Sequence, residues 1–260
     1  MQRIAMVTGG AGAIGLACAR RFARAGLVPV LADRDAGRLD AAIAALRAET
    51  GVAAIGIEAD LLDRDAPRAI MTRIAESFGR LDVLVNNAGL SGARRIGQVA
   101  LPEWDAVMAV NLTAPMLLVQ EAMRFWQAQR SGAIVNIASR VWLSGAGPGY
   151  TASKAGLVGL TRSLAVQLGP LGVTVNAVAP SYLGSGFNFG GDEATKRRAE
   201  EEHIRLGVLD RVATAEDVAG AVAFLASADA SFVTGEVLHV CGGAQLAARP
   251  ASAEVTDGRA

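Results

Sequence analysis

The chain has 260 residues, of which 52% are hydrophobic and 19% are charged, so enough apolar surface is available to offset the entropy of folding, and global disorder is excluded. It carries 25 lysines and arginines against 25 aspartates and glutamates, a balance without the broad positive field that a nucleic-acid partner favours. Two cysteines make no disulfide scaffold, and no apolar run approaches the roughly 18 residues of a membrane span, so we expect a cytoplasmic chain with no membrane partner.

Seven short apolar runs alternate with longer amphipathic stretches. Several runs lack the apolar and polar alternation of a half-exposed strand, which indicates burial on both faces. The stretches between them are long enough for crossover helices, so the pattern predicts an α/β fold with a doubly wound parallel sheet of about seven strands and helices on both faces. The predicted strands are residues 4–7, 28–32, 54–58, 81–86, 133–138, 173–179 and 236–240.

Helix boundary signals lie between these strands. Gly26 and Gly51 follow two amphipathic stretches, and Pro102 lies in the first turn of a third. Thr214, followed three residues later by Asp217, resembles a capped helix start. The predicted helices are residues 13–25, 38–48, 102–129, 150–168 and 215–226.

No linker rich in Pro, Ser or Gly divides the chain, so we expect one domain over residues 1–246. Residues 182–205 combine glycines and aromatic side chains with a charged stretch, which is typical of a substrate lid. Residues 247–260 are mostly small or polar and are predicted to form a C-terminal tail.

The first strand leads into a glycine-rich turn. Gly10, Gly12 and Gly15 match G-x-G-x-x-G, in which backbone N–H groups at a helix N-terminus face a phosphate. Asp33 follows 18 positions after Gly15, where a carboxylate can bind the adenosine ribose. A merely tight turn is the alternative, but this context favours a dinucleotide site. Because a carboxylate repels a 2′-phosphate, we expect NAD; NADP is the alternative, since Arg34 could pair with that phosphate.

Tyr150 and Lys154 are four positions apart and therefore share one face of a helix. A nearby ammonium lowers the pKa of a phenol and makes it a usable proton donor or acceptor near neutrality. The pair therefore predicts acid–base chemistry. A weak pair on a helix surface is the alternative.

These motifs belong to an ordered set that resembles the classical short-chain dehydrogenase/reductases over residues 1 to about 246. The resemblance implies a Rossmann-type sheet and hydride transfer between a nicotinamide cofactor and a CH–OH group. The matching motifs are Thr8-Gly9 with Ala13 and Gly15, Asp60-Leu61, Asn86-Asn87-Ala88-Gly89, Asn111, Ser139, Tyr150-x-x-x-Lys154, Asn176-Ala177-Val178-Ala179-Pro180 and Thr234-Gly235…Gly242-Gly243.

The resemblance also implies a role for each matched residue. Tyr150 would exchange the substrate's hydroxyl proton, Lys154 would bind the nicotinamide ribose and depress the pKa of Tyr150, and Ser139 would bind the substrate oxygen. Asn111 would hold a water in the proton relay, and no residue is assigned to a metal. The cofactor-binding residues would be Gly9, Gly12, Ile14, Gly15, Asp33, Asp60, Leu61, Asn87, Gly89, Tyr150, Lys154 and Ser185.

Two features of the site leave alternatives open. Ser139 precedes Tyr150 by 11 residues, a shorter gap than the family's, so Ser144 is the alternative substrate-binding serine. The aromatic side chains near the proposed site either line an apolar substrate pocket or anchor their loops to the core. These side chains are Trp142, Tyr182, Phe187 and Phe189, and the arginines that keep an anionic substrate open are Arg94, Arg95 and Arg140.

The leading hypothesis is an NAD(P)-dependent secondary-alcohol dehydrogenase or carbonyl reductase. A catalytically idle NAD(H)-binding sensor on the same fold is the alternative, and the complete set of site residues argues against it. An epimerase or dehydratase would need a larger substrate domain, for which the chain has no room. The helices over 102–129 and 150–168 match elements that pair across subunits in the family, so we expect a homotetramer; a monomer is the alternative, and light scattering separates the two.

Overall fold

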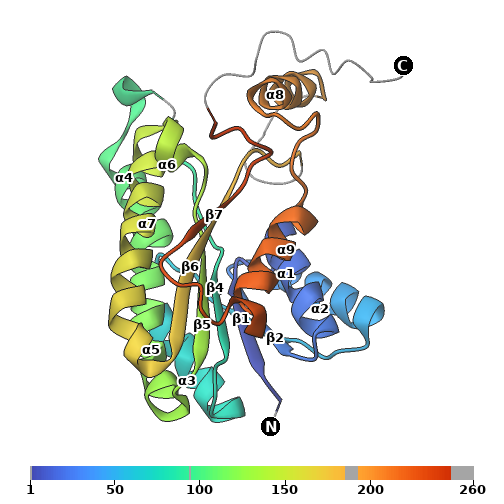
Figure 1. Ribbon diagram of the computed structural model, residues 1–260, viewed down its shortest axis with the longest axis vertical. Helices are drawn as coiled ribbons and strands as arrows, with labels where there is room; N and C mark the ends of the chain where they lie inside the picture. Colours follow the sequence, from blue (N-terminus) through green and yellow to red (C-terminus); the bar gives the residue numbers. More distant parts are fainter. Residues whose placement is uncertain (1, 94, 185–192, 247–260) are drawn as a thin grey trace, which may run out of the picture.

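The computed structural model describes residues 2–93, 95–184 and 193–246 (Figure 1). Within them, seven strands form one parallel sheet in the order β3-β2-β1-β4-β5-β6-β7. Each strand lies where an apolar run predicted it, and the α/β, Rossmann-type fold is confirmed. The strands are β1 (Ile4–Thr8), β2 (Val28–Asp33), β3 (Ile55–Glu58), β4 (Val83–Asn86), β5 (Gly132–Ile137), β6 (Val173–Pro180) and β7 (Val237–Val240).

Helices cover both faces of this sheet, with α1, α2 and α9 on one side and α3, α4, α5 and α7 on the other (Figure 1). Strand β1 shows why the strands are apolar throughout. Ala5 and Val7 pack in the cluster that contains α1, α2 and α9, whereas Ile4 and Met6 pack in the cluster that contains α3 and α5. The helices are α1 (Ala13–Arg24), α2 (Ala36–Thr50), α3 (Ala66–Phe78), α4 (Leu101–Met108), α5 (Ala114–Gln129), α6 (Val141–Ser144), α7 (Pro148–Leu168), α8 (Glu193–Leu206) and α9 (Ala215–Leu225).

Strand β1 lies between β2 and β4, at the point where the strand order reverses. The connection after β1 enters α1 on one face, and the connection after β4 leads to α4 and α5 on the other face. The two connections diverge and open a crevice at the carboxyl ends of the strands, where ligands of open α/β sheets bind. The fold therefore places the glycine-rich turn at this crevice.

Two helix starts follow from their capping residues. The Thr214 hydroxyl accepts a hydrogen bond from the Asp217 N–H, and the Asp217 carboxylate accepts one from the Thr214 N–H, so the predicted capped start of α9 is confirmed. Helix α2 begins at Ala36, two residues before the predicted boundary, because the Asp35 carboxylate accepts a hydrogen bond from the Arg38 N–H.

The predicted helix over 102–129 is present but changes its winding in the middle. Helix α4 passes into a π-helical turn, η2 (Ala109–Thr113), which continues into α5. The combined stretch Leu101–Gln129 has 29 residues and is long and apolar enough to cross a membrane. Polar residues interrupt every apolar run in this stretch, as expected, but they are too few to make the helix as a whole polar. Such a helix is weak evidence for a membrane, since 44% of its most apolar window is buried inside this fold, as in a core helix.

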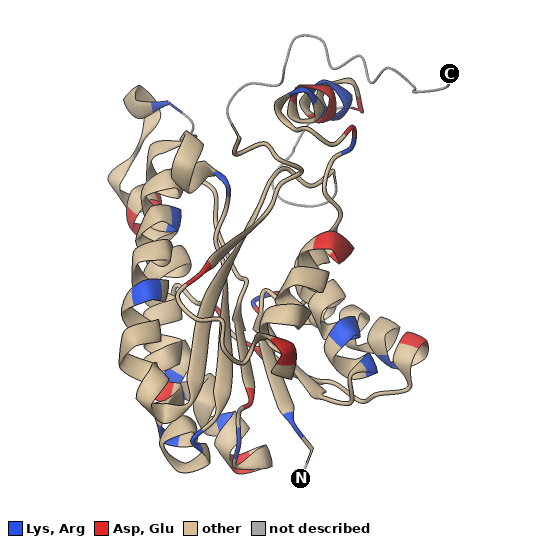
Figure 2. Cartoon of the chain, in the orientation of Figure 1, with Lys and Arg blue, Asp and Glu red and all other residues tan. Residues whose placement is uncertain are grey.

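The predicted lid over 182–205 is described in part. Its charged half forms α8 (Glu193–Leu206), on which acidic and basic side chains alternate around the helix (Figure 2). Residues 185–192 and the predicted tail 247–260 lie outside the described residues, and with them Ser185, Phe187 and Phe189. Arg94 also lies outside them.

Candidate active site

In the glycine-rich turn between β1 and α1, the backbone at Gly15 lies very close to the backbone of Gly9 and Gly10. Gly9 has a φ of 62°, a left-handed conformation that favours glycine. A Cβ on Gly15 would overlap the Gly9 carbonyl oxygen, so this position also requires glycine. Gly12 is the N-cap residue of α1 and has no capping side chain, so the first N–H groups of the helix donate no hydrogen bond to a side chain of this residue. The turn therefore fits the pyrophosphate of a dinucleotide, and Gly9, Gly12, Ile14 and Gly15 would hold it.

Thr8 and Asn87 join this turn to the end of β4. The buried Thr8 hydroxyl accepts hydrogen bonds from the N–H groups of Asn87 and Ala88, both at 3.0 Å. The Asn87 carboxamide donates to the carbonyl oxygens of Thr8 at 2.9 Å and Gly9 at 3.1 Å. The Asn87 side chain thus holds the glycine-rich turn in shape, and Thr8 is a functional residue whose part the sequence motif did not disclose.

Asp33 at the end of β2 lies beside the same turn. Its Oδ2 accepts a hydrogen bond from the Ala11 N–H at 3.0 Å, and its Oδ1 accepts one from the Asp35 N–H at 3.4 Å. Arg34 is exposed. The Asp33 carboxylate is therefore oriented by backbone donors at the position where the adenosine ribose of a dinucleotide would lie.

The predicted adenine contacts extend from the neighbouring strand. Strand β3 pairs with β2, with Glu58 opposite Asp33, so Asp60 and Leu61 follow β3 at the same edge of the sheet as Asp33. Asp60 is exposed and its Oδ1 accepts a hydrogen bond from the Leu62 N–H at 3.0 Å. Gly89 follows β4 at this edge.

Ser139, Tyr150 and Lys154 come together beyond the end of β5. The Tyr150 phenol forms a hydrogen bond with the Ser139 side chain, and Lys154 Nζ lies 5.7 Å from the centre of the Tyr150 ring. Lys154 is 3% exposed and Nζ donates to the Ile137 carbonyl oxygen at 2.7 Å. Ser144, the alternative serine, lies at the exposed end of α6, where its hydroxyl accepts a hydrogen bond from Arg140 at 3.0 Å. The geometry thus favours Ser139 as the partner of Tyr150.

Burial shifts the two proton-carrying groups in opposite directions. Burial raises the pKa of Tyr150, and the hydrogen bond with Ser139 opposes this only in part. Burial also lowers the pKa of Lys154 from 10.5 to about 8. The pKa of the Tyr150 phenol is therefore raised overall, whereas a nearby ammonium led us to expect a lowered one, because removal from water disfavours the charged form of both groups.

Asn111 is 1% exposed and lies in the π-helical turn η2. Its Oδ1 accepts a hydrogen bond from the Leu90 N–H at 2.7 Å, and its Nδ2 donates to the Leu90 carbonyl oxygen at 2.9 Å. Nδ2 also donates to the Ser153 hydroxyl at 3.0 Å, and Ser153 donates to the Tyr150 carbonyl oxygen at 2.8 Å. The Asn111 side chain thus binds protein groups, and the water expected at this residue stays a prediction. Ser153 was not singled out in the sequence, although it lies between Tyr150 and Lys154.

Trp142 is partly buried, and for this one of the aromatic side chains the structure favours the anchoring alternative. It packs against the buried cluster that contains Ala138, Val158 and Ala177. Its indole N–H donates to His239 Nε2 at 3.3 Å, and the two rings are stacked with their centres 6.1 Å apart. Trp142 therefore anchors α6 to β7.

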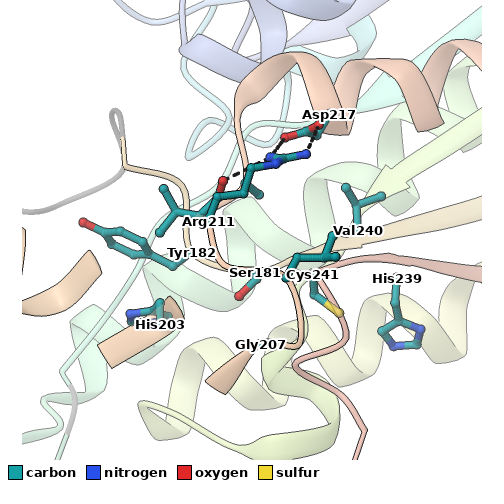
Figure 3. A pocket seen from close by; sticks show the side chains of 13 residues that line it. Ser181, Tyr182, His203, Gly207, Arg211, Asp217, His239, Val240 and Cys241 are labelled. Atoms are coloured by element: carbon teal, nitrogen blue, oxygen red, sulfur yellow. Dashed lines mark hydrogen bonds and ion pairs between the residues drawn. The ribbon is translucent and has the colours of Figure 1, made fainter. Parts of the chain in front are cut away.

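A cavity of about 180 Å³ lies between α8, the start of α9 and the carboxyl ends of β6 and β7 (Figure 3). Tyr182 stacks on His203 of α8 with ring centres 4.4 Å apart, and Arg211 pairs with Asp217 at 2.6 Å. Ser181 and Tyr182, which follow Pro180 at the end of β6, line this cavity. Among the described residues, no group of three or more His, Cys, Asp or Glu side chains is placed to hold a metal ion.

Comparisons with known proteins show similarity over nearly the whole chain. A family described as enoyl-(acyl carrier protein) reductase matches residues 9–245. The chain is 37% identical over 246 residues to the (2S)-[(R)-hydroxy(phenyl)methyl]succinyl-CoA dehydrogenase subunit BbsD of Thauera aromatica, covering 94% of this chain and 97% of that protein. The structure of levodione reductase matches with a TM-score of 0.90 and 33% identity, covering 95% of this chain and 98% of the other. NAD⁺-bound xylitol dehydrogenase matches with a TM-score of 0.82 and 29% identity, covering 93% and 98%.

The raised phenol pKa can be measured directly, because the chain has only two tyrosines. In Tyr182→Phe without cofactor, the absorbance of phenolate should appear with a midpoint above the ordinary value of about 10. Circular dichroism on the same samples checks that the chain stays folded, and Tyr150→Phe serves as the control that reports Tyr182. A midpoint below the ordinary value would mean that the charge of Lys154 outweighs burial.

The buried lysine should change how stability depends on pH. Because the pKa of Lys154 falls from 10.5 to about 8 on folding, the unfolded chain binds the lysine proton more tightly between these values, and the contribution of Lys154 to the free energy of unfolding rises with pH across that window. The shift corresponds to about 3 kcal/mol. The raised pKa values of Cys18 and Tyr150 act in the opposite direction but are common to wild type and Lys154→Met, so the difference in the free energy of unfolding between the two proteins, measured with urea below and above the window, should show the rise. The same rise in both proteins would contradict the lowered pKa.

Proposed function

The chain belongs to the classical short-chain dehydrogenase/reductase family, and on that premise we propose that it transfers a hydride between NAD and a secondary alcohol or the corresponding ketone, with Tyr150 as the acid–base residue. The observation that carries the proposal is the cluster of Ser139, Tyr150 and Lys154 at the carboxyl edge of the sheet, beside a glycine-rich turn shaped for a dinucleotide. The idle-sensor alternative does not require this cluster.

The proposed chemistry divides the work among three side chains. In alcohol oxidation, Tyr150 Oη takes the proton of the substrate hydroxyl, and the Ser139 hydroxyl that it contacts orients the substrate oxygen. Lys154 Nζ supplies the positive charge that stabilises the phenolate across 5.7 Å from the ring centre. When bound, a nicotinamide ring accepts the hydride from the carbinol carbon.

For the cofactor we propose NAD in preference to NADP. The Asp33 carboxylate is held by the N–H groups of Ala11 and Asp35, so it would accept hydrogen bonds from the ribose hydroxyls and repel a 2′-phosphate. The xylitol dehydrogenase structure that resembles this chain is NAD⁺-bound, which supports the same choice. The exposed Arg34 favours NADP.

For the substrate we propose a secondary alcohol with an apolar or aromatic body beside the carbinol. The name of the Thauera aromatica relative gives its substrate a hydroxy(phenyl)methyl group, and Tyr182 presents an aromatic ring to the cavity beyond Pro180. Trp142 contributes nothing to this proposal, because it packs in the core. A substrate screen that compares an aryl carbinol with an open-chain polyol tests the choice, and a preference for the polyol would reject it.

The homotetramer expected from the family resemblance stays a proposal. Helices α5 and α7 expose apolar side chains that a second copy would cover, with Met116 36% and Val166 79% exposed.

Arg95 is exposed, so an anionic substrate remains an alternative.

The first test of the proposed function is Tyr150→Phe. The ring stays and the transferable proton is lost, so turnover of secondary alcohols should fall by at least about a hundredfold while NAD⁺ affinity changes little. Reduced nicotinamide is followed spectrophotometrically, and cofactor binding by fluorescence titration. Retention of most of the turnover would remove Tyr150 from the mechanism.

The cofactor preference is tested at Asp33. Asp33→Ser removes the carboxylate and should shift the ratio of kcat/KM for NAD⁺ and NADP⁺ toward NADP⁺ by about tenfold or more. Asp35→Ser is the matched control, because it removes a carboxylate two residues away that caps α2 instead. A wild-type protein that prefers NADP⁺ would defeat the proposal and direct attention to Arg34.

A further inference from the structure

The helix that carries Tyr150 lies unusually close to the π-helical turn that carries Asn111. A Cβ added at Gly156 of α7 would lie 2.8 Å from Cδ2 of Leu112, and one added at Gly149 would lie 3.3 Å from Trp104 of α4. Two glycines of α7 thus remove the side chains that would hold the helices apart. Short polar side chains can therefore meet in the interface between them.

Ser153 and Asn111 are the polar side chains that meet there. Ser153 is 0% exposed and Asn111 is 1% exposed. The Ser153 hydroxyl accepts a hydrogen bond from Asn111 Nδ2 at 3.0 Å and donates one to the Tyr150 carbonyl oxygen at 2.8 Å. The other hydrogen bonds of the Asn111 side chain go to the backbone of Leu90, just beyond the end of β4.

These contacts form one chain of hydrogen bonds from the end of β4 to the catalytic helix. Leu90 holds Asn111, Asn111 holds Ser153, and Ser153 holds the backbone of Tyr150 one turn earlier on α7. Every link joins a donor to an acceptor, and the central link between Asn111 and Ser153 is buried, where a low local dielectric strengthens a hydrogen bond. A shift of Asn111 is therefore passed to the residue proposed as acid–base group.

We propose, on the basis of the proposed function, that Ser153 is a positioning residue for the hydride-transfer reaction: its hydroxyl couples the Asn111 carboxamide to the backbone of Tyr150 and so holds both groups in place. An alanine here would leave Asn111 Nδ2 with an unpaired proton in a dry interface, which favours rotation of the carboxamide and relaxation of the π-helical turn. A threonine would keep the hydroxyl, because a helical threonine can bond to a carbonyl oxygen one turn earlier.

The kinetic test compares Ser153→Ala with wild type in alcohol oxidation with NAD⁺. We expect kcat to fall by about tenfold, the cost of leaving one buried donor unpaired, while KM for NAD⁺ changes by less than about twofold. Ser153→Thr should restore most of the lost kcat. Ser163→Ala is the matched control, since Ser163 lies on the same helix, is exposed and accepts a hydrogen bond from the Gln167 side chain at 3.0 Å.

A double variant tests whether Ser153 acts through Asn111. If it does, Ser153→Ala should lower kcat no further when Asn111→Ala is already present, and the two losses should not multiply. The inference is overturned if wild type oxidises the alcohol and Ser153→Ala does so with the same kcat. It is also overturned by a loss in Ser153→Ala that Ser153→Thr fails to restore although the threonine variant unfolds at the wild-type temperature.

A readout without turnover separates this inference from the proposed function. The Leu90 N–H donates a hydrogen bond to Asn111 Oδ1 at 2.7 Å. Hydrogen exchange of this N–H should be about tenfold faster in Ser153→Ala than in Ser163→Ala. If wild type oxidises no secondary alcohol, the proposed function fails and this exchange rate alone decides the inference. Faster exchange would then support the positioning of Asn111 by Ser153, and unchanged exchange would overturn it.

Discussion

Helices cover both faces of the parallel sheet, so its charged and catalytic side chains can meet a ligand only at the edge where the strands end. The strand residues Ala5, Val7, Ile4 and Met6 face helices on alternate sides and are all buried. Charged or catalytic groups within such strands would lose water without gaining partners. The glycine-rich turn, Asp33 and Ser139 therefore all follow strands and meet at the carboxyl edge.

The polar groups that do lie inside are tied into chains that set the position of the catalytic helix. Asn86 of β4 donates to Asn136 of β5 at 2.8 Å, Asn136 donates to Thr161 of α7 at 2.9 Å, and Thr161 donates to the Leu157 carbonyl oxygen at 2.7 Å. The chain through Asn111 and Ser153 reaches the same helix from the other end. The two networks thus hold the position and the rotation of α7, and with them the orientation of the Tyr150 and Lys154 side chains.

Burial sets the electrostatics of the proposed acid–base pair. Removal from water disfavours both the phenolate of Tyr150 and the ammonium of Lys154, so burial raises the pKa of the phenol and lowers that of the lysine. Positive charge near the phenol would favour proton loss from it, and the carbonyl oxygen of Ile137 holds the lysine beside the ring without neutralising it. The site thus responds to charges that a ligand brings.

The sequence alone determined the seven strands, the capped start of α9 and the residues that gather at the strand ends, because apolar runs, glycine spacing and capping pairs are local properties. The tertiary structure alone decided that Trp142 packs against Ala177, that Ser139 rather than Ser144 contacts Tyr150, and that Ser153 joins Asn111 to α7. It also reversed the expected shift of the Tyr150 pKa. Each of these depends on which distant segments exclude water from a side chain, and neither spacing nor composition encodes that burial.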